Sequence, residues 1–598
     1  MNASNATDLS ATRRRVHELG RGGEFRAAAD AADRGLKQWP NDAELHLLRA
    51  LASERLGEWA NVVRHGAEFE RLAPERDPMD ISIGWALVQL GDVAAALPRL
   101  ERAAQRHPGN ATAWMNLGIA VKHLGDLDRA RDCQRRAGEC DASLPQPWMN
   151  LASIEQDCGS PERAIEALDA LHARFGPLPQ AESLRAFLTL CRPTGSPTAD
   201  RAIAERAAVA IEATVRDIAP PQFRNERKRG KRLRVGFFSG DFRDHSVASF
   251  ALPLVESLDR ASIEPILFSS ASAPDAVTAR FARTAPLVDV RGLTPKALVE
   301  NARGKRLDVA IDLSGHSAGN SLAAFAARIA PVQTTWLGYA GTTGIRTMDA
   351  RFVDWRTDPI GCERACTERL VRLDPCFLCW RSREDVPLPP ERSESDEPLT
   401  FGSFNDLSKL SDATLDAWAR ILMASPDARL VLKNYGLRYR AARDVLVARF
   451  ATRGVAAERI EMIAWTATSA EHLALYGRVD VALDSFPYNG TTTTCEALWM
   501  GTPVVVLEGG THHARVGASL LRAIGRDDLV APTIDVYVER AIAAGSEQLR
   551  RAAGRRAAMR AAVARSPLRD EQGFARRFEA ALRAAWHAYC DTTTTPRR

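Results

Sequence analysis

The chain has 598 residues, too many for a single hydrophobic core, so we expect two to four domains. Hydrophobic residues make up 45% of it and charged residues 26%, a composition that excludes a disordered or fibrous protein. The net charge of +5 is small and most basic residues alternate with acidic ones, which argues against a nucleic-acid partner. No apolar signal sequence and no long apolar run occurs, so we expect a cytoplasmic protein with no membrane partner.

In the N-terminal third, glycine recurs every thirty-four residues. The repeated positions are Gly23, Gly57, Gly91, Gly125 and Gly159, and Pro40, Pro74 and Pro108 keep the same spacing. This is the period of the tetratricopeptide repeat, in which each unit is a pair of helices. One pair cannot bury its apolar face alone, so successive pairs stack into a superhelix with a concave groove. We therefore predict an α-solenoid over residues 1–175.

Two asparagines occupy equivalent positions on the first helices of successive repeats. Asn116 and Asn150 are separated by one repeat length. Their amides can form hydrogen bonds with the backbone of an extended chain, so they predict an acceptor groove for a protein or peptide. The alternative is exposed polar filler, because the equivalent positions in the two preceding repeats are Ser82 and Leu48.

The pattern of predicted secondary structure changes after the repeats. Residues 176–231 read as a helical linker with proline and glycine breaks. Short β-rich apolar runs then alternate with amphipathic helices, first over residues 232–395 and again over residues 396–535. This alternation predicts two doubly wound α/β domains with parallel sheets, which meet at a ligand-binding cleft. Residues 536–598 are predicted to form C-terminal helices and a tail.

The segment VDVALDSFPYNGTTTTCEALWMG, residues 479–501, reads as a strand, a loop and a helix. We place the helix at residues 493–500, so Thr491 to Thr493 lie at its N-terminus. Unpaired amides and the helix dipole make such a position a phosphate site. Glu496, one turn further on, is placed to bind a pair of ribose hydroxyls. The alternative is an ordinary cap, for which Thr493 and Glu496 form a capping box.

Three further side chains are candidates for chemistry. Lys409 follows the predicted strand FGSFN, where an ammonium can neutralise a diphosphate leaving group without a metal. His245 lies in the loop after the first strand of the first sheet and can accept a proton from a hydroxyl. His472 is the other histidine with a favourable context, although a structural role is the common alternative for such residues. The sequence has no P-loop and no glycine-rich dinucleotide fingerprint, which argues against a kinase or a dehydrogenase.

Four cysteines fall close enough in the sequence to suggest zinc. They are Cys362, Cys366, Cys376 and Cys379. The last two belong to LVRLDPCFLCW, which we predict to be a strand, and a strand points neighbouring side chains to opposite faces. We therefore expect no metal site and ten free thiols.

Six motifs follow the repeats in a fixed order. They are RVGFFSGDFRDHSVA, DLSGHSAGNSL, APVQTTWLGYAGTTG, FGSFNDLSKLS, ARLVLK and DVALDSFPYNGTTTTCEALWMGTPVV. With them, nearly the whole chain resembles the protein O-glycosyltransferases of the O-GlcNAc transferase and SPINDLY family. The resemblance implies a GT-B fold, which is a pair of Rossmann-like domains, and an inverting, metal-independent sugar transfer to Ser or Thr of a protein. It also implies no cofactor, repeats that bring in the acceptor, and the option of a homodimer through the repeats.

The resemblance assigns roles to individual residues. It places His245 beside the sugar and the acceptor as a candidate base, and it makes Lys409 the essential lysine at the diphosphate. The residues that it aligns with the nucleotide-sugar site are Asn405, Asp406, Lys409, His472, Thr491, Thr492, Thr493, Glu496, Gly341 and Thr342. Within this set it implies that His472 contacts the base, that the threonines surround the diphosphate, and that Glu496 binds the ribose.

Two positions depart from the O-GlcNAc transferase pattern. Thr491 replaces a histidine, and Ser469 replaces a lysine near the base. Here the sequence is more similar to SPINDLY, whose plant members transfer fucose from GDP-fucose. We predict transfer of GlcNAc from UDP-GlcNAc, with O-fucosyl transfer from GDP-fucose as the alternative. The repeats argue against a glycan or lipid acceptor, and the presence of Lys409 and His245 argues against a scaffold with an inactive transferase half.

Overall fold

The computed structural model describes residues 3–192, 196–391 and 398–592. The predicted domain boundary at 395/396 and the last six residues of the tail lie outside these ranges. The chain divides into two compact units, residues 1–154 with 439–441, and residues 155–438 with 442–598. In the described ranges, no helix has the length and apolar content needed to cross a membrane.

The repeats form antiparallel helices, as the thirty-four-residue period predicts. Their bounds are α1 (Ala3–Arg21), α2 (Phe25–Gln38), α3 (Ala43–Leu56), α4 (Trp59–Leu72), α5 (Asp80–Gln89), α6 (Val93–Arg106), α7 (Ala111–Leu124), α8 (Leu127–Cys140), α9 (Gln146–Asp157) and α10 (Pro161–Phe175). All five spaced glycines have φ between 69° and 97°, the left-handed region that L-residues disfavour. Each glycine therefore ends a first helix and lets the second begin within two or three residues.

The segment that we predicted as a helical linker contains two helices. These are α11 (Pro179–Leu190) and α12 (Pro197–Ala213), each of which begins with a proline at its first turn. Ala208 and Ile211 of α12 are buried in the hydrophobic core of the sheet that follows in the chain. This helix therefore belongs structurally to the first α/β domain.

The first α/β domain is a parallel sheet of seven strands. They are β1 (Leu233–Ser239), β2 (Ile263–Ser269), β3 (Leu287–Asp289), β4 (Val309–Asp312), β5 (Val332–Thr335), β6 (Ala350–Val353) and β7 (Arg369–Arg372), in the order β3-β2-β1-β4-β5-β6-β7. The connecting helices are α13 (Ala248–Ser257), α14 (Ala276–Thr284), α15 (Pro295–Gly304) and α16 (Leu322–Ala326). Phe238 and Phe268 stack across β1 and β2 with ring centroids 4.2 Å apart.

The second α/β domain is a parallel sheet of six strands. They are β8 (Thr400–Ser403), β9 (Arg429–Lys433), β10 (Ile460–Ile463), β11 (Val481–Leu483), β12 (Val504–Leu507) and β13 (Val530–Ala531), in the order β10-β9-β8-β11-β12-β13. Its helices are α17 (Asp412–Ala424), α18 (Arg440–Ala451), α19 (Ser469–Ala474), α20 (Thr492–Trp499), α21 (Val516–Ala523) and α22 (Ile534–Ala544). The strand order reverses between β8 and β11, and open α/β sheets bind ligands in the crevice at such a point.

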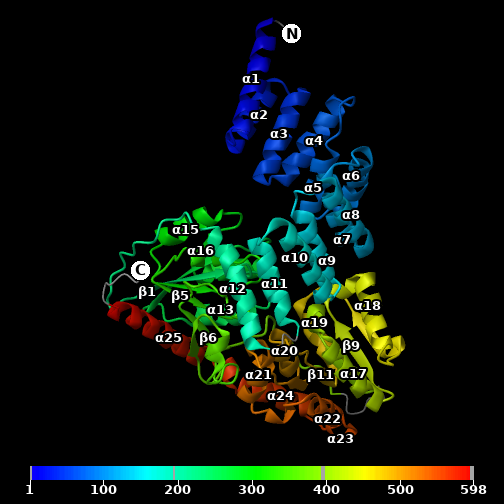
Figure 1. Ribbon diagram of the computed structural model, residues 1–598, viewed down its shortest axis with the longest axis vertical. Helices are drawn as coiled ribbons and strands as arrows, with labels where there is room; N and C mark the ends of the chain where they lie inside the picture. The colour runs from blue at the N-terminus through cyan, green and yellow to red at the C-terminus, as the bar shows by residue number, and fades with distance from the viewer. Residues whose placement is uncertain (1–2, 193–195, 392–397, 593–598) are drawn as a thin grey trace. The chain divides into compact units, whose positions relative to one another are not determined.

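The last helices return to the first sheet. After α23 (Glu547–Arg550) and α24 (Arg555–Ala564), α25 (Glu571–Asp591) lies along the first α/β domain, and Figure 1 shows it in red beside the green strands. Phe578 of α25 packs with its ring centroid 5.1 Å from that of Trp336 and 4.7 Å from that of Phe352. The two sheets and this return crossing, together with the repeats, confirm the predicted α-solenoid followed by a GT-B pair of Rossmann-like domains.

One predicted strand is wrong beyond its first three residues. Only Leu370–Arg372 of the segment LVRLDPCFLCW lie in a strand, as the last three residues of β7. From Leu373 onward the backbone is irregular, because the Phe377 N–H donates to the Asp354 carboxylate and the Trp336 indole donates to the Phe377 carbonyl. Side chains therefore satisfy backbone groups that a strand would have paired.

The α25 contact predicts a large stability effect. Phe578→Ala removes a fully buried ring between Trp336 and Phe352, so the free energy of unfolding should fall by about 3–5 kcal/mol. Chemical denaturation measures the difference. Arg576→Ala on the exposed face of the same helix is the control and should change stability by less than about 0.5 kcal/mol. Equal effects of the two variants would show that α25 does not contribute to the core.

Candidate active site

The predicted site residues lie at the carboxyl ends of parallel strands in both α/β domains. His245 follows β1, and Asn405 and Lys409 follow β8. The loop of residues 484–490, which we call the diphosphate loop, follows β11 and leads into α20. Since β8 and β11 flank the point where the strand order of the second sheet reverses, the fold itself puts Asn405, Lys409 and this loop at one crevice.

Lys409 is a cation without a counter-ion in contact. Its Nζ lies 3.8 Å from the centroid of the Tyr488 ring and donates to the Asn489 carbonyl oxygen at 3.3 Å. Among the described residues, no carboxylate comes within the 4.0 Å of an ion pair with this ammonium. Burial lowers the pKa of Lys409, because water no longer stabilises its charge. Such a group favours an incoming anion, which would restore the missing charge partner.

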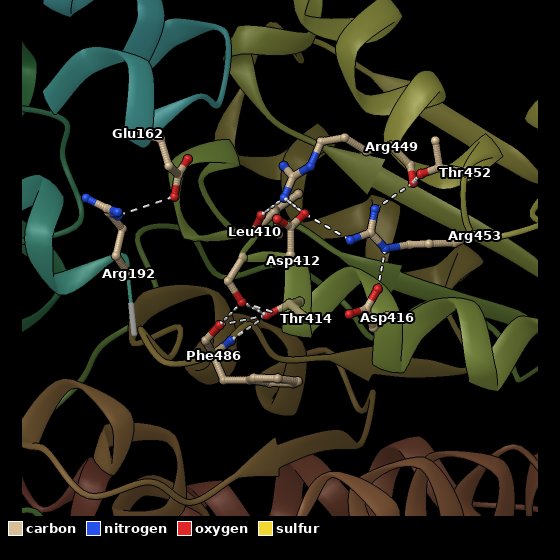
Figure 2. Close-up of polar contacts among 11 residues, drawn as sticks. Glu162, Arg192, Leu410, Asp412, Thr414, Asp416, Arg449, Thr452, Arg453 and Phe486 are labelled. Carbon is tan, nitrogen blue, oxygen red and sulfur yellow. Dashed lines mark hydrogen bonds and ion pairs between the residues drawn. The ribbon is translucent and has the colours of Figure 1, made fainter. Parts of the chain in front are cut away.

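The diphosphate loop is anchored from behind by α17. The Thr414 hydroxyl donates to the Phe486 carbonyl at 2.7 Å and accepts the Phe486 N–H at 3.1 Å, and Figure 2 shows Thr414 beside Phe486. Ser411 donates to the same carbonyl at 2.6 Å. Arg449 in turn donates to the Leu410 carbonyl at 2.8 Å. The two segments that carry Lys409 and the loop are therefore fixed to each other.

The threonines divide into two groups. The Thr493 hydroxyl donates to Asn405 Oδ1 at 2.7 Å, and the Thr494 hydroxyl donates to the Gly490 carbonyl at 3.1 Å. The hydroxyls of Thr491 and Thr492 have no hydrogen-bond partner among the described residues. They precede the first-turn amides of α20, which have no acceptor within the helix. This end of the crevice thus offers several donors and no carboxylate in contact with Lys409 among the described residues.

The predicted capping box is wrong. The helix begins at Thr492, one residue earlier than predicted, and its cap residue Thr491 makes no side-chain capping bond. Thr493 is bonded to Asn405, and Glu496 has partners elsewhere. Bonds to residues distant in the sequence have replaced the local cap.

The end of the crevice where we predict the nucleoside, which we call the nucleoside end, is a network of paired charges. His472 Nε2 donates to Glu496 Oε2 at 2.9 Å, and Lys433 Nζ donates to His472 Nδ1 at 2.8 Å. Arg383 donates to Glu496 Oε1 at 3.0 Å. Burial alone would raise the pKa of Glu496, but His472 and Arg383 outweigh it and lower the pKa. Each carboxylate oxygen still has a free lone pair, so hydroxyls of a ribose can bind Glu496 in addition.

Arg383 also connects the two α/β domains across the crevice. It donates to Asp244 at 3.1 Å, and Asp244 precedes His245 in the loop after β1. The guanidinium therefore joins the glutamate at the nucleoside end to the loop of the candidate base.

His245 is half-buried. The Val247 N–H donates to its Nδ1 at 3.3 Å, and Asp241 Oδ1 lies 3.6 Å from the same nitrogen. Burial lowers the pKa of His245, Asp241 opposes that shift, and Arg243 and Arg383 add to it. To accept a proton through Nε2, the ring must carry its other proton on Nδ1, which requires Nδ1 to give up the Val247 N–H and to donate to Asp241 instead.

Not all predicted residues join this cluster. Asp406 is exposed and accepts the Ser408 N–H at 3.0 Å. The Thr342 hydroxyl donates to the Glu368 carboxylate at 2.6 Å. Gly341 and Thr342 line a separate cavity of about 300 Å³, together with His512. Neither residue has a hydrogen bond to Lys409 or to the diphosphate loop in the described ranges, so their role in donor binding stays a prediction.

Comparisons with known proteins agree with this geometry. The profile of glycosyl transferase family 41 matches residues 193–387 and 388–578, and a tetratricopeptide repeat profile matches residues 13–61 and 81–145. The chain belongs to glycosyl transferase family 41. This confirms the resemblance to the O-GlcNAc transferase and SPINDLY proteins that the motifs predicted.

Individual relatives match a part of this chain. A tomato protein named as a probable UDP-N-acetylglucosamine–peptide N-acetylglucosaminyltransferase SPINDLY is 36% identical over 365 residues, 60% of this chain and 39% of the relative. An Arabidopsis thaliana protein with the same activity name, SEC, is 26% identical over 60% of this chain and 38% of the relative. The matched part thus spans about two fifths of these relatives. Among solved structures, a mutant O-GlcNAc transferase from Thermobaculum terrenum aligns with a TM-score of 0.77, 34% identity, and coverage of 86% of this chain and 97% of that one.

The repeats of this family 41 member use one predicted groove residue internally. Asn150 donates to Gln134 Oε1 at 3.1 Å, and Gln134 donates to the Met115 carbonyl at 3.0 Å. Asn116 is 5% exposed. The asparagine ladder for an acceptor peptide stays a prediction.

The four clustered cysteines contact protein groups. Arg351 donates to Cys366 Sγ at 3.6 Å, Arg515 donates to Cys362 Sγ at 3.2 Å, and Cys376 lies 3.9 Å from the Ser519 hydroxyl. Burial raises the pKa of the Cys366 thiol to about 11 and that of Cys379 to about 12, so both are protonated at neutral pH. Within the described ranges, no three His, Cys, Asp or Glu side chains are grouped as metal ligands.

Sequence reasoning missed Arg383, Lys433 and Asp484 in this family 41 site. Arg383 lies in a segment that reads as a charged linker, and its partner Glu496 is 113 residues away. Lys433 ends the quoted motif ARLVLK, and Asp484 ends the predicted strand VDVALD. Their positions at the carboxyl ends of β9 and β11 were the signal that could have identified them.

The contacts of His245 predict how its pKa responds to substitution of Asp241. Asp241→Asn removes the carboxylate that raises the pKa of His245, so this pKa should fall further below its ordinary value of about 6.5. Deuterium exchange at the imidazole carbon, followed across pH by mass spectrometry, reports the change. His316, whose pKa burial lowers to about 4, should not move in the same experiment. A raised or unchanged pKa of His245 would contradict the contact.

Proposed function

We propose that this protein is an O-glycosyltransferase that moves a sugar from a nucleoside diphosphate sugar to Ser or Thr hydroxyls of proteins, with inversion and without a metal. The observation that carries the proposal is the Lys409 ammonium, which has no carboxylate in contact and lies beside the amide end of α20. A cation that is not already paired with a carboxylate, beside several backbone donors, can stabilise a departing diphosphate.

The reaction is a single displacement. The acceptor hydroxyl oxygen attacks the anomeric carbon, the bond from that carbon to the diphosphate oxygen breaks, and the hydroxyl proton passes to His245. Burial lowers the pKa of His245 and so favours the neutral imidazole, and Asp241 stabilises the imidazolium that forms. Lys409 stabilises the charge that develops on the diphosphate, which takes the place of a divalent cation in this proposal.

The repeats are the proposed acceptor-binding part. A stacked helical array presents an extended concave surface, which suits a polypeptide better than a lipid or a small glycan. The family 41 relatives whose names state a peptide acceptor support this assignment.

For the donor we propose UDP-GlcNAc. The names of the SPINDLY, SEC and O-GlcNAc transferase relatives support it. GDP-fucose is the second candidate, because the local motifs depart from the O-GlcNAc transferase pattern at Thr491 and Ser469 and because the SPINDLY relatives share 36% identity against 26% for SEC.

Calorimetry with UDP and GDP tests the donor. UDP should bind the full-length protein more tightly than GDP, and a chelator should leave the affinity unchanged because Lys409 provides the positive charge. Transfer to protein in a cell extract, read by mass spectrometry of the peptides, identifies the sugar. Tighter binding of GDP together with fucosylated peptides would replace the first donor by the second. Failure to bind either nucleotide would refute the proposed function.

Lys409→Ala tests the site directly. It removes a charge-assisted contact of about 1.5–3 kcal/mol that strengthens in the transition state, so kcat/KM should fall roughly ten- to a hundredfold. Initial rates of peptide glycosylation measure the loss. Lys296→Ala, an exposed lysine on α15, is the control and should keep the wild-type rate. Normal turnover by the Lys409 variant would remove this residue from the mechanism.

A further inference from the structure

Asp484 is a buried carboxylate at the centre of the crevice. It directly follows β11, beside the strand-order reversal of the second sheet, and it is 2% exposed. A buried carboxylate is costly unless hydrogen bonds or a cation stabilise its charge. No ion pair within 4.0 Å joins Asp484 to a cation in the described residues.

One oxygen of this carboxylate holds three separate parts of the donor site. Oδ1 accepts the Gly490 N–H at 2.7 Å and the Ser485 N–H at 2.9 Å, which closes the diphosphate loop onto its own first residue. It also accepts the Asn405 side-chain N–H at 2.9 Å. That bond fixes which way the Asn405 amide faces, so that Asn405 Oδ1 is turned to the Thr493 hydroxyl.

The other oxygen is buried and has no hydrogen-bond partner among the residues that the structure describes. Gly517 is packed so closely that a Cβ there would lie 2.8 Å from Asp484 Oδ2. An unsatisfied carboxylate oxygen in a tight pocket is unfavourable for folding, since its desolvation is not compensated. A residue needed only for packing would be better filled by a neutral side chain, so the carboxylate indicates a function.

We propose that Asp484 is the positioning residue of the donor site, whose ionised carboxylate holds the diphosphate loop, the Asn405 amide and Thr493 in the arrangement that receives the diphosphate next to Lys409. This inference rests on the proposed function, because it takes the Lys409 crevice as the place of the diphosphate. Asp484 does not touch the donor in this arrangement. It acts through Asn405 and through the loop.

The charge environment supports a titration close to physiological pH. Burial raises the pKa of Asp484 to about 7, while the bonds from Gly490 and Asn405 and the charge of Lys409 oppose the shift. The titratable groups that face Asp484 are Lys409 from the segment after β8 and Tyr537 from α22, whose hydroxyl donates to the Asp484 carbonyl at 2.9 Å. Above this pKa the carboxylate is ionised and its hydrogen bonds with the three donors are strongest. Below it the carboxyl group is protonated and these hydrogen bonds are weaker.

The test compares Asp484→Asn with the wild type at two pH values. An asparagine keeps one acceptor oxygen for the same three donors but has no charge, so it resembles the protonated aspartate. Calorimetry with whichever of UDP and GDP the wild type binds should show about tenfold weaker binding by the variant at pH 8.5. At pH 6, where the wild type is itself largely protonated, the difference should be less than about threefold. The ionisation of the nucleotide is common to both proteins and cancels in the comparison.

Asp480→Asn is the matched control. Asp480 is also fully buried, but it lies at the other end of β11, roughly 13 Å away along the strand, where it accepts the Thr400 N–H at 2.9 Å. This variant should bind the nucleotide as the wild type does at both pH values. If Asp484→Asn does not fold, Asn405→Ala removes the link between Asp484 and Thr493 and should weaken binding at least about fivefold.

Two results would overturn the inference. One is equal affinity of wild type and Asp484→Asn at both pH values, and the other is a loss of the same size at both, which would mean a static packing defect. If Asn405→Ala is used in place of Asp484→Asn, nucleotide binding with the affinity of the wild type would also overturn the inference. A wild type that binds neither nucleotide refutes the proposed function instead, so the two failures are distinguishable.

Discussion

The rest of the site depends on an ammonium that is kept apart from carboxylates. Lys409 lies on the ring of Tyr488 and donates to one carbonyl, and its pKa is lowered because burial is not offset by an ion pair. A carboxylate in contact would have stabilised the folded protein but would have filled the position that an anion needs. The fold therefore keeps Asp484 near the ammonium and bound to Asn405 and to backbone amides instead.

The two ends of the crevice differ in how their charged groups are paired. At the diphosphate end, Lys409 has no carboxylate in contact, and the hydroxyls of Thr491 and Thr492 have no partner among the described residues. At the nucleoside end, each Glu496 oxygen is paired, one with His472 and the other with Arg383, and Lys433 donates to His472. Binding strength should therefore come from the first end, where a new charge contact forms. Selectivity between bases should come from the second, where a ligand has to fit a rigid set of donors and acceptors.

The features that could be predicted from the sequence are those that depend on neighbouring residues in the chain. The repeat glycines take positive φ at each turn, and the strand ends that carry Lys409 and His245 follow from the apolar periodicity. Long-range pairing explains what it could not. Thr493 and Glu496 fit a capping box, yet their partners lie 88 and 24 residues away and are stronger than a local cap. No periodic pattern in the sequence identifies Arg383. Its partners Asp244 and Glu496 lie in two different domains, which only the tertiary fold brings together.

The crossings between the two α/β domains constrain how the crevice can open. The chain leaves the first domain near Trp380 and returns through Leu568 to α25, and these crossings are bonded to each other, since the Trp380 N–H donates to the Leu568 carbonyl at 2.8 Å. The Arg381 guanidinium adds a bond to Glu571 at 2.9 Å. Hydrogen bonds therefore join the two crossings to each other. Arg383 lies two residues beyond Arg381, so the side chain that contacts Glu496 belongs to one of these crossings.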